Sequence, residues 1–253
     1  MPAKGNAVRN AATRATRITA PTVGADTGDP GRDPAGAKAG ASPAPRRPGR
    51  PAATAGQRDQ LLDAATLLFS QHGVAGTPIK AIAAAAGVTP ALVHYYFRDR
   101  DQLLDAVVDE RLQPLVDQVF PAEPPAAAAP DAIAVVVALA GQLIRVAAAT
   151  PWFPGLWIRE IVSADGQLRE RVVQRIAVRR ATQVGGLLAT ARDRGELNPG
   201  LEPALVMVSL IGLTLLPLAT THIWRNLPGA DAIDTEALVR HVGALLAQGL
   251  KAP

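Results

Sequence analysis

The side chains best suited to bind another molecule stand at the starts of two short predicted helices. Thr77 is followed by Pro78, and Thr89 by Pro90, so each pair combines a hydroxyl suited to a helix N-cap with a proline that a first turn tolerates. Lys80 adds a positive charge beside the first of these starts. The N–H groups and the dipole at a helix start favour phosphate groups. The pattern therefore predicts a surface that binds a phosphate-bearing partner.

Enzymatic chemistry finds little support in the residue types. The chain of 253 residues has no cysteine, which excludes cysteine nucleophiles, thiolate zinc sites and disulfides. Its four histidines, His72, His94, His222 and His241, are scattered without the spacing of metal ligands. The H-E-x-x-H, G-x-S-x-G, G-x-G-x-x-G and P-loop motifs are missing from the sequence. We therefore expect no catalytic residues, no metal, no cofactor and no enzyme activity.

The elements that would position these threonines are an amphipathic helix and two short helices. Residues 58–71 carry apolar side chains at the spacing i, i+1, i+4, i+7 and i+8, which predicts a helix that Gly73 ends. One short helix is predicted after Thr77 and another over Pro90–Tyr96, with Gly87 between them. Two short helices joined by a three-residue turn that contains glycine make a helix-turn-helix.

The residues of this segment form a composite motif of about a dozen positions. The motif consists of Thr77, Ile82-Ala83, Ala86-Gly87-Val88-Thr89, Val93-His94-Tyr95-Tyr96-Phe97, Arg100 and Leu103-Leu104. Over roughly residues 57–112 it resembles the DNA-binding domain of the TetR family of bacterial one-component transcriptional regulators. Two positions depart from the family pattern, since Ala91 stands where Gly is frequent and His94 where Tyr is frequent. Both departures change the surface that would face DNA.

The resemblance implies which side chains contact DNA. A recognition helix inserts its N-terminal half into the major groove, where side chains reach base edges and flanking phosphates. Family positions that contact the DNA backbone match Tyr96 and Arg100. The predicted DNA-binding residues are Thr77, Lys80, Thr89, Pro90, Ala91, His94, Tyr95, Tyr96 and Arg100, together with Arg47 and Arg50 upstream of the first helix.

The net charge of +4 is unevenly distributed along the chain. Residues 1–56 hold nine basic and three acidic residues, so this segment carries +6 and the remainder about −2. Residues 57–110 hold four basic and seven acidic residues, about −3. A negative charge is unusual for a domain whose affinity depends on phosphate contacts. We therefore expect the basic N-terminal segment to supply part of the electrostatic attraction to DNA.

Residues 1–55 are predicted to be a disordered basic tail. The first 56 residues contain eight prolines, eight glycines, no aromatic residue and no leucine, so they cannot bury enough apolar surface to fold. The run Arg46-Arg47-Pro48-Gly49-Arg50-Pro51 has the form of an extended basic segment that can follow a minor groove. Alternative interpretations of the first twenty residues are a transit peptide, or a leader that follows a start codon assigned too early.

The rest of the chain predicts an all-α fold. Asp99 and Gln102 have capping-box spacing for a longer helix, and the prolines of 121–130 mark a connector. Further helices are predicted over about 132–149, 152–163, 166–194 and 234–250, and the arginines of 171–179 are predicted to form a solvated face. We predict about nine helices, with a three-helix helix-turn-helix domain over 56–116 and a larger ligand-binding and dimerisation domain over 117–253.

Residues 203–224 form a stretch of 22 residues without a formal charge, which is long enough to cross a bilayer. Pro217, His222 and several hydroxyl side chains in the stretch argue against a membrane span. The TetR resemblance implies instead that this penultimate helix and the last helix form a four-helix bundle across a dimer two-fold axis. The predicted dimer interface is therefore about 201–224 and 234–250, with no membrane partner.

Five aromatic or imidazole side chains are candidates for an effector site, because small-molecule sites are mostly apolar and aromatic. They are Trp152, Phe153, Trp157, His222 and Trp224. We predict a cytoplasmic, homodimeric repressor that binds a palindromic operator in double-stranded DNA and is released by a small hydrophobic effector. The alternatives are a membrane-tethered regulator and a helical ligand-binding protein with a vestigial helix-turn-helix.

Overall fold

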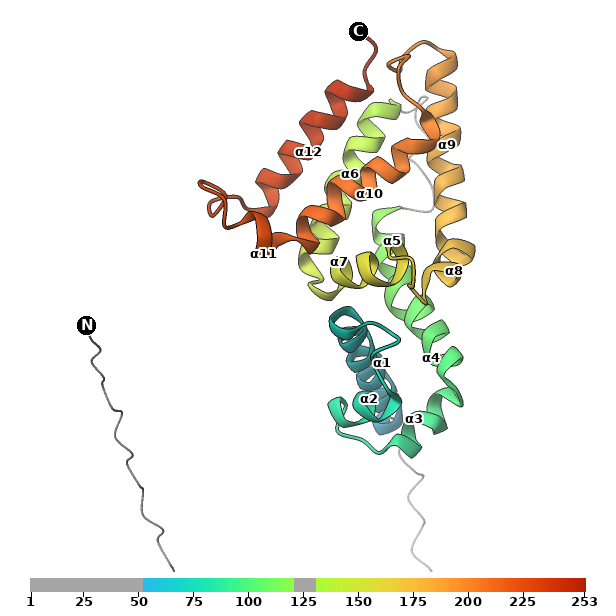
Figure 1. Ribbon diagram of the computed structural model, residues 1–253. Coiled ribbons are helices and arrows are strands. Elements are labelled where there is room, and N and C mark those ends of the chain that lie inside the picture. The colour runs from blue at the N-terminus through green and yellow to red at the C-terminus, as the bar shows by residue number, and fades with distance from the viewer. Residues whose placement is uncertain (1–51, 121–130) are drawn as a thin grey trace, which may run out of the picture. The chain divides into compact units, whose positions relative to one another are not determined.

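The computed structural model describes residues 52–120 and 131–253, and all their regular secondary structure is helical (Figure 1). The predicted all-α fold with about nine helices is confirmed. The elements are α1 (Ala52–His72), α2 (Ile79–Ala85), α3 (Pro90–Phe97), α4 (Arg100–Val107), η1 (Val108–Leu112), α5 (Gln113–Val119), α6 (Ala132–Ala149), α7 (Trp152–Trp157), η2 (Ile158–Val162), α8 (Arg169–Val172), η3 (Val173–Ala177), α9 (Val178–Asp193), α10 (Pro203–Ala219), α11 (Thr221–Trp224) and α12 (Thr235–Leu250), where η denotes a π-helical turn. The predicted disorder of the tail, the tail arginines Arg47 and Arg50, and the predicted connector at 121–130 lie outside the described residues.

The first three helices form the predicted helix-turn-helix segment. Helix α1 starts at Ala52, so residues 52–55, which the sequence assigned to the tail, belong to this helix. Gly73 ends α1 with a φ of +76°, a left-handed conformation that glycine adopts without a steric penalty. Its N–H donates to the carbonyl oxygen of Phe69 over 3.0 Å. Helix α3 begins at Pro90, as predicted.

Local capping explains where the longer helices begin. The carboxylate of Asp99 accepts a hydrogen bond from the backbone N–H of Gln102 at 2.8 Å and starts α4. Asp131 accepts from the N–H groups of Ile133 and Ala134 and starts α6. Asp234 starts α12 in the same way. Each carboxylate satisfies N–H groups that have no partner within the helix.

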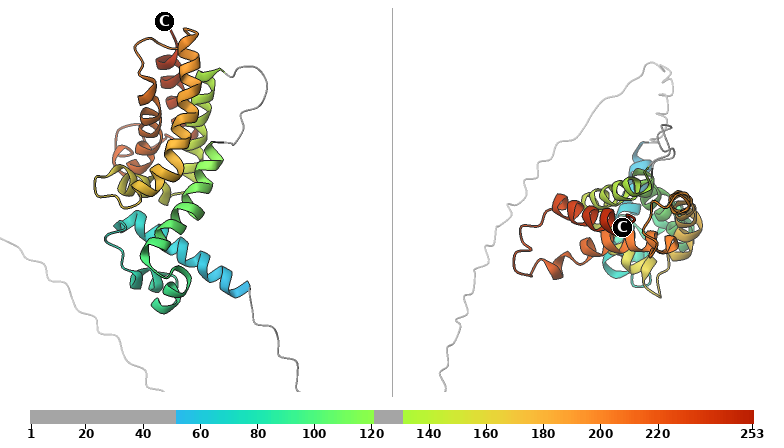
Figure 2. Two further views of the ribbon diagram at one scale, coloured as in Figure 1. Left: turned by 90° about the vertical axis from the view of Figure 1, so that its right-hand side faces the viewer. Right: turned by 90° about the horizontal axis from the view of Figure 1, so that it is seen from above.

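The buried side chains form one apolar core that runs from α1 to α12. Helix α6 is central to the C-terminal helices, because α10 and α12 both pack against it (Figures 1 and 2). Helix α7 packs against α1, so the helix-turn-helix segment and the C-terminal helices share this core. The predicted division between residues 116 and 117 falls within α5 and stays a prediction.

The uncharged stretch over 203–224 is not one helix. Helix α10 ends at Ala219, and the four-residue α11 follows after Thr220. Of the described helices, only α6 has the length and hydropathy to cross a membrane, and half of it is buried inside the protein. A buried core helix satisfies the same two criteria.

Candidate functional site

Helix α3 is anchored by two apolar side chains and presents its other face to solvent. Val93 and Phe97 are buried. The predicted contact residues Thr89, Pro90, Ala91, His94 and Tyr95 are all exposed. Tyr95 has 74% of its surface accessible, whereas Tyr96 is half-buried. The structure therefore brings five of the predicted residues together on one accessible surface.

The two tyrosines of α3 have different surroundings. Their ring centroids lie 5.3 Å apart in an edge-on arrangement, and Tyr96 also packs beside Phe97. Tyr96 therefore supports Tyr95 from the core side of the helix. Thr89 has extended backbone geometry at the N-cap, but its side chain makes no capping hydrogen bond. The hydroxyl thus stands at the exposed start of α3 without a role in capping.

Thr77 differs from the prediction, because its side chain is only 2% exposed. The hydroxyl donates to the carbonyl oxygen of Gly73 at 2.7 Å, and the N-cap of α2 is Pro78, without a side-chain cap. A side chain that is buried and turned back towards α1 cannot reach a phosphate in this structure. The prediction that the Thr77 hydroxyl caps the N-terminus of α2 is therefore wrong. Lys80, in the first turn of α2, is exposed as expected.

Arg100 is directed at the turn between α1 and α2. Its guanidinium donates to the carbonyl oxygen of Thr77 at 2.9 Å and also to that of Val74. These bonds fix the turn that precedes α2. The side chain therefore stabilises the helix-turn-helix from within, and any effect on phosphate binding would be indirect.

Arg98, which the sequence does not single out, takes part in this region. Arg98 directly follows α3, is exposed and has a φ of 43°, which is uncommon for a residue other than glycine. An exposed cation at the end of α3 is placed to contact a phosphate. The positive charge of Arg98 and its position just after the predicted helix could have identified this residue from the sequence.

From the sequence, Glu160 is expected to form a surface pair with Arg159 or to orient a polar group of an effector, and the fold shows a different role. Its carboxylate is buried, with 4% of the residue exposed. One oxygen accepts from the N–H of Val74 at 2.8 Å, and the other from the N–H of Gln167 at 2.9 Å. Val74 is thus held through its N–H by η2 and through its carbonyl oxygen by Arg100. The turn between α1 and α2 is tied to the C-terminal helices.

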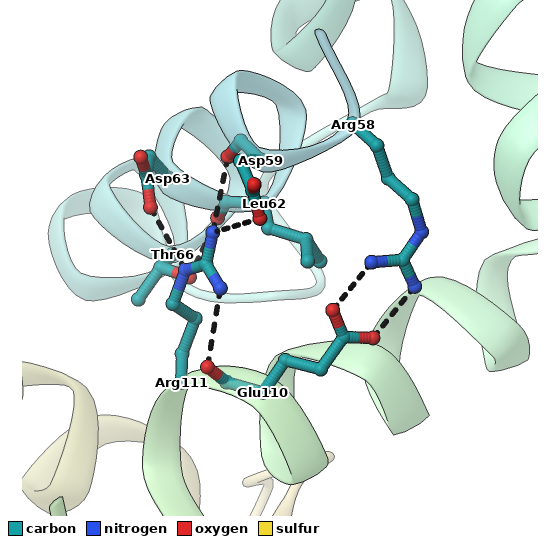
Figure 3. A network of polar contacts seen from close by, with 7 residues as sticks. All are labelled: Arg58, Asp59, Leu62, Asp63, Thr66, Glu110 and Arg111. Atoms are coloured by element: carbon teal, nitrogen blue, oxygen red, sulfur yellow. Dashed lines mark hydrogen bonds and ion pairs between the residues drawn. The ribbon is translucent and has the colours of Figure 1, made fainter. Parts of the chain in front are cut away.

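Charge pairs join α1 to η1 (Figure 3). Arg58 donates to both carboxylate oxygens of Glu110, and its guanidinium lies 5.1 Å from the ring centre of Phe97. Arg111 pairs with Asp63 at 2.8 Å and with Asp59 at 3.1 Å. The hydrogen bonds from Arg58 are the largest influence that holds the pKa of Glu110 below its usual value. Glu110 therefore remains ionised, and Arg58 compensates its charge.

A second set of charge pairs joins α4 and η1 to α8 and η3. Arg171 contacts Asp101 at 2.7 Å and Asp105 at 2.8 Å. Arg175 contacts Asp105 at 3.0 Å and Asp109 at 2.8 Å. Arg171 is half-buried, so the predicted solvated face of arginines is wrong for this residue, whereas Arg175 is exposed as predicted although it is ion-paired. Arg179 is exposed, as expected.

The predicted effector residues fall into two groups. Trp152, Phe153 and Trp157 stack edge-on along α7, with ring centroids 6.1 Å and 5.7 Å apart. Phe153 and Trp157 are buried. On α11, the indole N–H of Trp224 donates to the carbonyl oxygen of Pro217 at 2.6 Å, and His222 is exposed. Sequence order alone could not show this separation.

Grooves run along α10 on the surface of the described residues. A groove of about 450 Å³ is lined by Leu216, Pro217, Thr220, Trp224, Ile233, Ala237, Leu238 and His241. It includes Trp224 but none of the three aromatic residues of α7. A larger hollow of about 670 Å³ lies between α9 and α10, with Val184 and Met207 among its lining residues. His241, which the sequence left without a role, is the histidine that lines the first groove.

Comparison with known proteins identifies the helix-turn-helix. Residues 61–107 match the family model described as bacterial regulatory proteins, tetR family. The HTH-type transcriptional regulator BetI of Paraburkholderia xenovorans is 39% identical over 59 residues, which are 23% of this chain and 30% of the relative. BetI of Brucella suis is 28% identical over 184 residues, 72% of this chain and 86% of that protein. The first curated relatives are matched over only about a third of their length.

Solved structures share the fold over most of the chain. KstR2 of Mycobacterium tuberculosis, a ketosteroid transcriptional regulator, aligns over 78% of this chain and 96% of its own, with a TM-score of 0.59 and 14% identity. FadR of Bacillus subtilis in complex with stearoyl-CoA aligns over 76% and 98%, with a TM-score of 0.57 and 19% identity. The chain therefore shares the all-helical fold of these proteins. Residues 61–107 are a TetR-family helix-turn-helix domain.

The buried position of Thr77 gives a first prediction. Thr77→Val keeps the shape but removes the bond to Gly73, so we expect a loss of about 1–2 kcal/mol in the free energy of unfolding. Thr77→Ser retains the hydroxyl and is the control. DNA affinity per folded molecule should be unchanged in both variants. Denaturant titration and DNA retardation measure the two quantities, and weaker DNA binding at unchanged stability would restore Thr77 as a contact residue.

Proposed function

We propose that this protein is a transcriptional regulator that binds a two-fold symmetric operator as a homodimer and is released by a small hydrophobic effector. The observation that supports this most directly is the exposed surface of α3, where Thr89, Pro90, Ala91, His94 and Tyr95 stand on a TetR-family helix-turn-helix. Hydroxyl, imidazole and phenol groups can read base edges and hold phosphates. Lys80 and Arg98 supply nearby exposed cations.

The proposed dimer surface is an exposed apolar face on α10 and α12. Leu205, Val208 and Leu216 of α10 and Leu245 of α12 are each about half or more exposed. Contiguous exposed apolar side chains indicate an interface. Leu205 and Leu245 also line an open groove of about 330 Å³ between the two helices. A second copy that covers this face would form the interface predicted over 201–224 and 234–250.

Dimerisation would determine the two-fold symmetry of the operator and the spacing of its half-sites. Two recognition helices related by a two-fold axis read half-sites about 34–36 Å apart. An effector that changes this spacing releases the DNA. A nearly complete switch requires the effector to prefer the released state by about 5.5 kcal/mol.

The proposed effector is apolar. Two places have the chemistry of a hydrophobic ligand site. One is the aromatic cluster on α7, and the other is the mainly apolar groove that Trp224 of α11 lines. The FadR structure described above holds stearoyl-CoA, so a ligand with a long apolar chain is compatible with this fold. Both the groove and the α7 cluster are candidate positions, and Trp224 belongs to the groove.

DNA retardation tests the proposal. We expect the protein to bind the DNA upstream of its own gene at low salt. His94→Ala should cost about 1 kcal/mol or more of specific binding, because α3 loses a group that faces the bases. His72→Ala, which removes an exposed histidine at the end of α1, is the matched control and should have no effect. If the wild-type protein does not bind this DNA, the proposal that it is a transcriptional regulator is overturned, and the alternative of a helical ligand-binding protein remains.

The dimer face is tested separately. Val208→Glu places a charge in the proposed interface, where burial of an unpaired charge is costly, so sedimentation should show a monomer. Val178→Glu is the control, because Val178 is similarly exposed at 57% but lies on α9. A dimer that survives Val208→Glu unchanged would move the interface elsewhere.

The basic tail makes a further, distinct prediction. Exchange of Arg46, Arg47 and Arg50 for Ala should flatten the dependence of log affinity on log salt by about 0.9 for each phosphate that the tail no longer neutralises. The triple exchange of Arg9, Arg14 and Arg17 removes the same charge from a different part of the tail and should change the slope less. An identical slope in both variants and the wild type would remove the tail from DNA binding.

A further inference from the structure

The acidic residues of the helix-turn-helix segment are nearly all paired with arginines. Residues 57–110 contain seven acids and four cations. Glu110 pairs with Arg58 of the same segment. Five others pair with cations from outside it, namely Asp59 and Asp63 with Arg111, and Asp101, Asp105 and Asp109 with Arg171 and Arg175. The segment therefore receives most of its compensating charge from later elements.

The pairs with Arg171 and Arg175 form a ladder. Asp101, Asp105 and Asp109 are four residues apart and lie on one face of α4 and η1. The two arginines are also four residues apart and interleave with them, so that Asp105 is shared by both. Burial alone would raise the pKa of Asp105, but the two guanidinium groups outweigh it and hold that pKa below its usual value. Asp105 is thus ionised near neutral pH, and the two arginines pair with all three aspartates.

The ladder begins close to the DNA-facing surface. Asp101 lies in the first turn of α4, four residues after Phe97 at the end of α3, so their Cα atoms are at most about 15 Å apart. The side chain of Asp101 is 81% exposed. Charges within about 15 Å of the end of α3 are incompletely screened at low salt, because the Debye length is about 30 Å at 0.01 M and about 8 Å at 0.15 M.

We infer that Arg171 and Arg175 set the DNA affinity of the helix-turn-helix without touching DNA, by compensating the negative charge of Asp101, Asp105 and Asp109. This inference rests on the proposed DNA-binding function and specifies how that function is regulated. Any movement that draws α8 and η3 away from α4 exposes uncompensated carboxylates beside the recognition helix. Repulsion of the DNA phosphates then assists release.

A purely mechanical role for the ladder makes a different prediction. If the pairs only hold α4 in place, removal of the two arginines and removal of Asp101 and Asp105 break three ion pairs in common and change DNA affinity in the same direction. If they act through charge, removal of the arginines and removal of the aspartates have opposite effects. The sign of the two changes therefore separates the two roles.

The experiment uses the full chain and the DNA upstream of its gene, at 0.05 M and 0.2 M salt. We expect Arg171→Gln with Arg175→Gln to weaken binding about three- to tenfold at the lower salt, and Asp101→Asn with Asp105→Asn to tighten it by a similar factor. The combined variant, whose net charge equals that of the wild type, should return to within about twofold of it. All effects should shrink at the higher salt.

Two controls accompany the variants. Arg145→Gln with Arg192→Gln removes the same charge from α6 and α9, and should leave binding unchanged. Thermal unfolding of every variant shows that the compared proteins are folded, and binding is expressed per folded molecule. If the arginine and aspartate variants both weaken binding, or neither changes it, the inference is overturned but the proposed DNA-binding function is not. If the wild-type protein does not bind DNA, the proposed function fails and the inference with it.

Discussion

Six of the seven carboxylates between residues 57 and 110 pair with arginines, which lowers the negative charge that the helix-turn-helix segment presents to a polyanion. In this protein the compensation comes from arginines that lie on α1, η1, α8 and η3. The packing of the C-terminal helices against α4 therefore has an electrostatic role besides its apolar one. The same arginines that join the helices also determine the charge near α3. Under the proposed function, one set of contacts links stability and DNA affinity.

A second connection fixes the turn before α2. The peptide group of Val74 is held on both sides, through its N–H by Glu160 and through its carbonyl oxygen by Arg100. Because Glu160 is buried, its two backbone donors supply the hydrogen bonds that a desolvated carboxylate requires. Glu160 lies in η2, which directly follows α7 and its aromatic residues. A ligand that displaced this helix would act on the helix-turn-helix through a short and specific path.

The candidate site was partly predictable because much of it depends on local structure. The exposure of His94 and Tyr95, and the burial of Val93 and Phe97, follow from the helical period of α3. Thr77 was not predictable in this way, since its hydroxyl is turned back to the end of α1 by the turn geometry. The effector residues illustrate the same limit, because aromatic composition identifies candidates but not which of them line one cavity.

The sequence by itself determined the all-helical class, the helix starts at Pro90 and after Asp131 and Asp234, and the helix-turn-helix motif. Caps, prolines and glycines act within a few residues, so their effects can be read along the chain. Only the tertiary structure decided that Arg171 meets Asp101 and that Glu160 meets Val74. Helical periodicity shows which face of a helix is polar but not which helix it faces. The +4 net charge therefore revealed little until the fold showed which carboxylates of residues 57–110 pair with arginines.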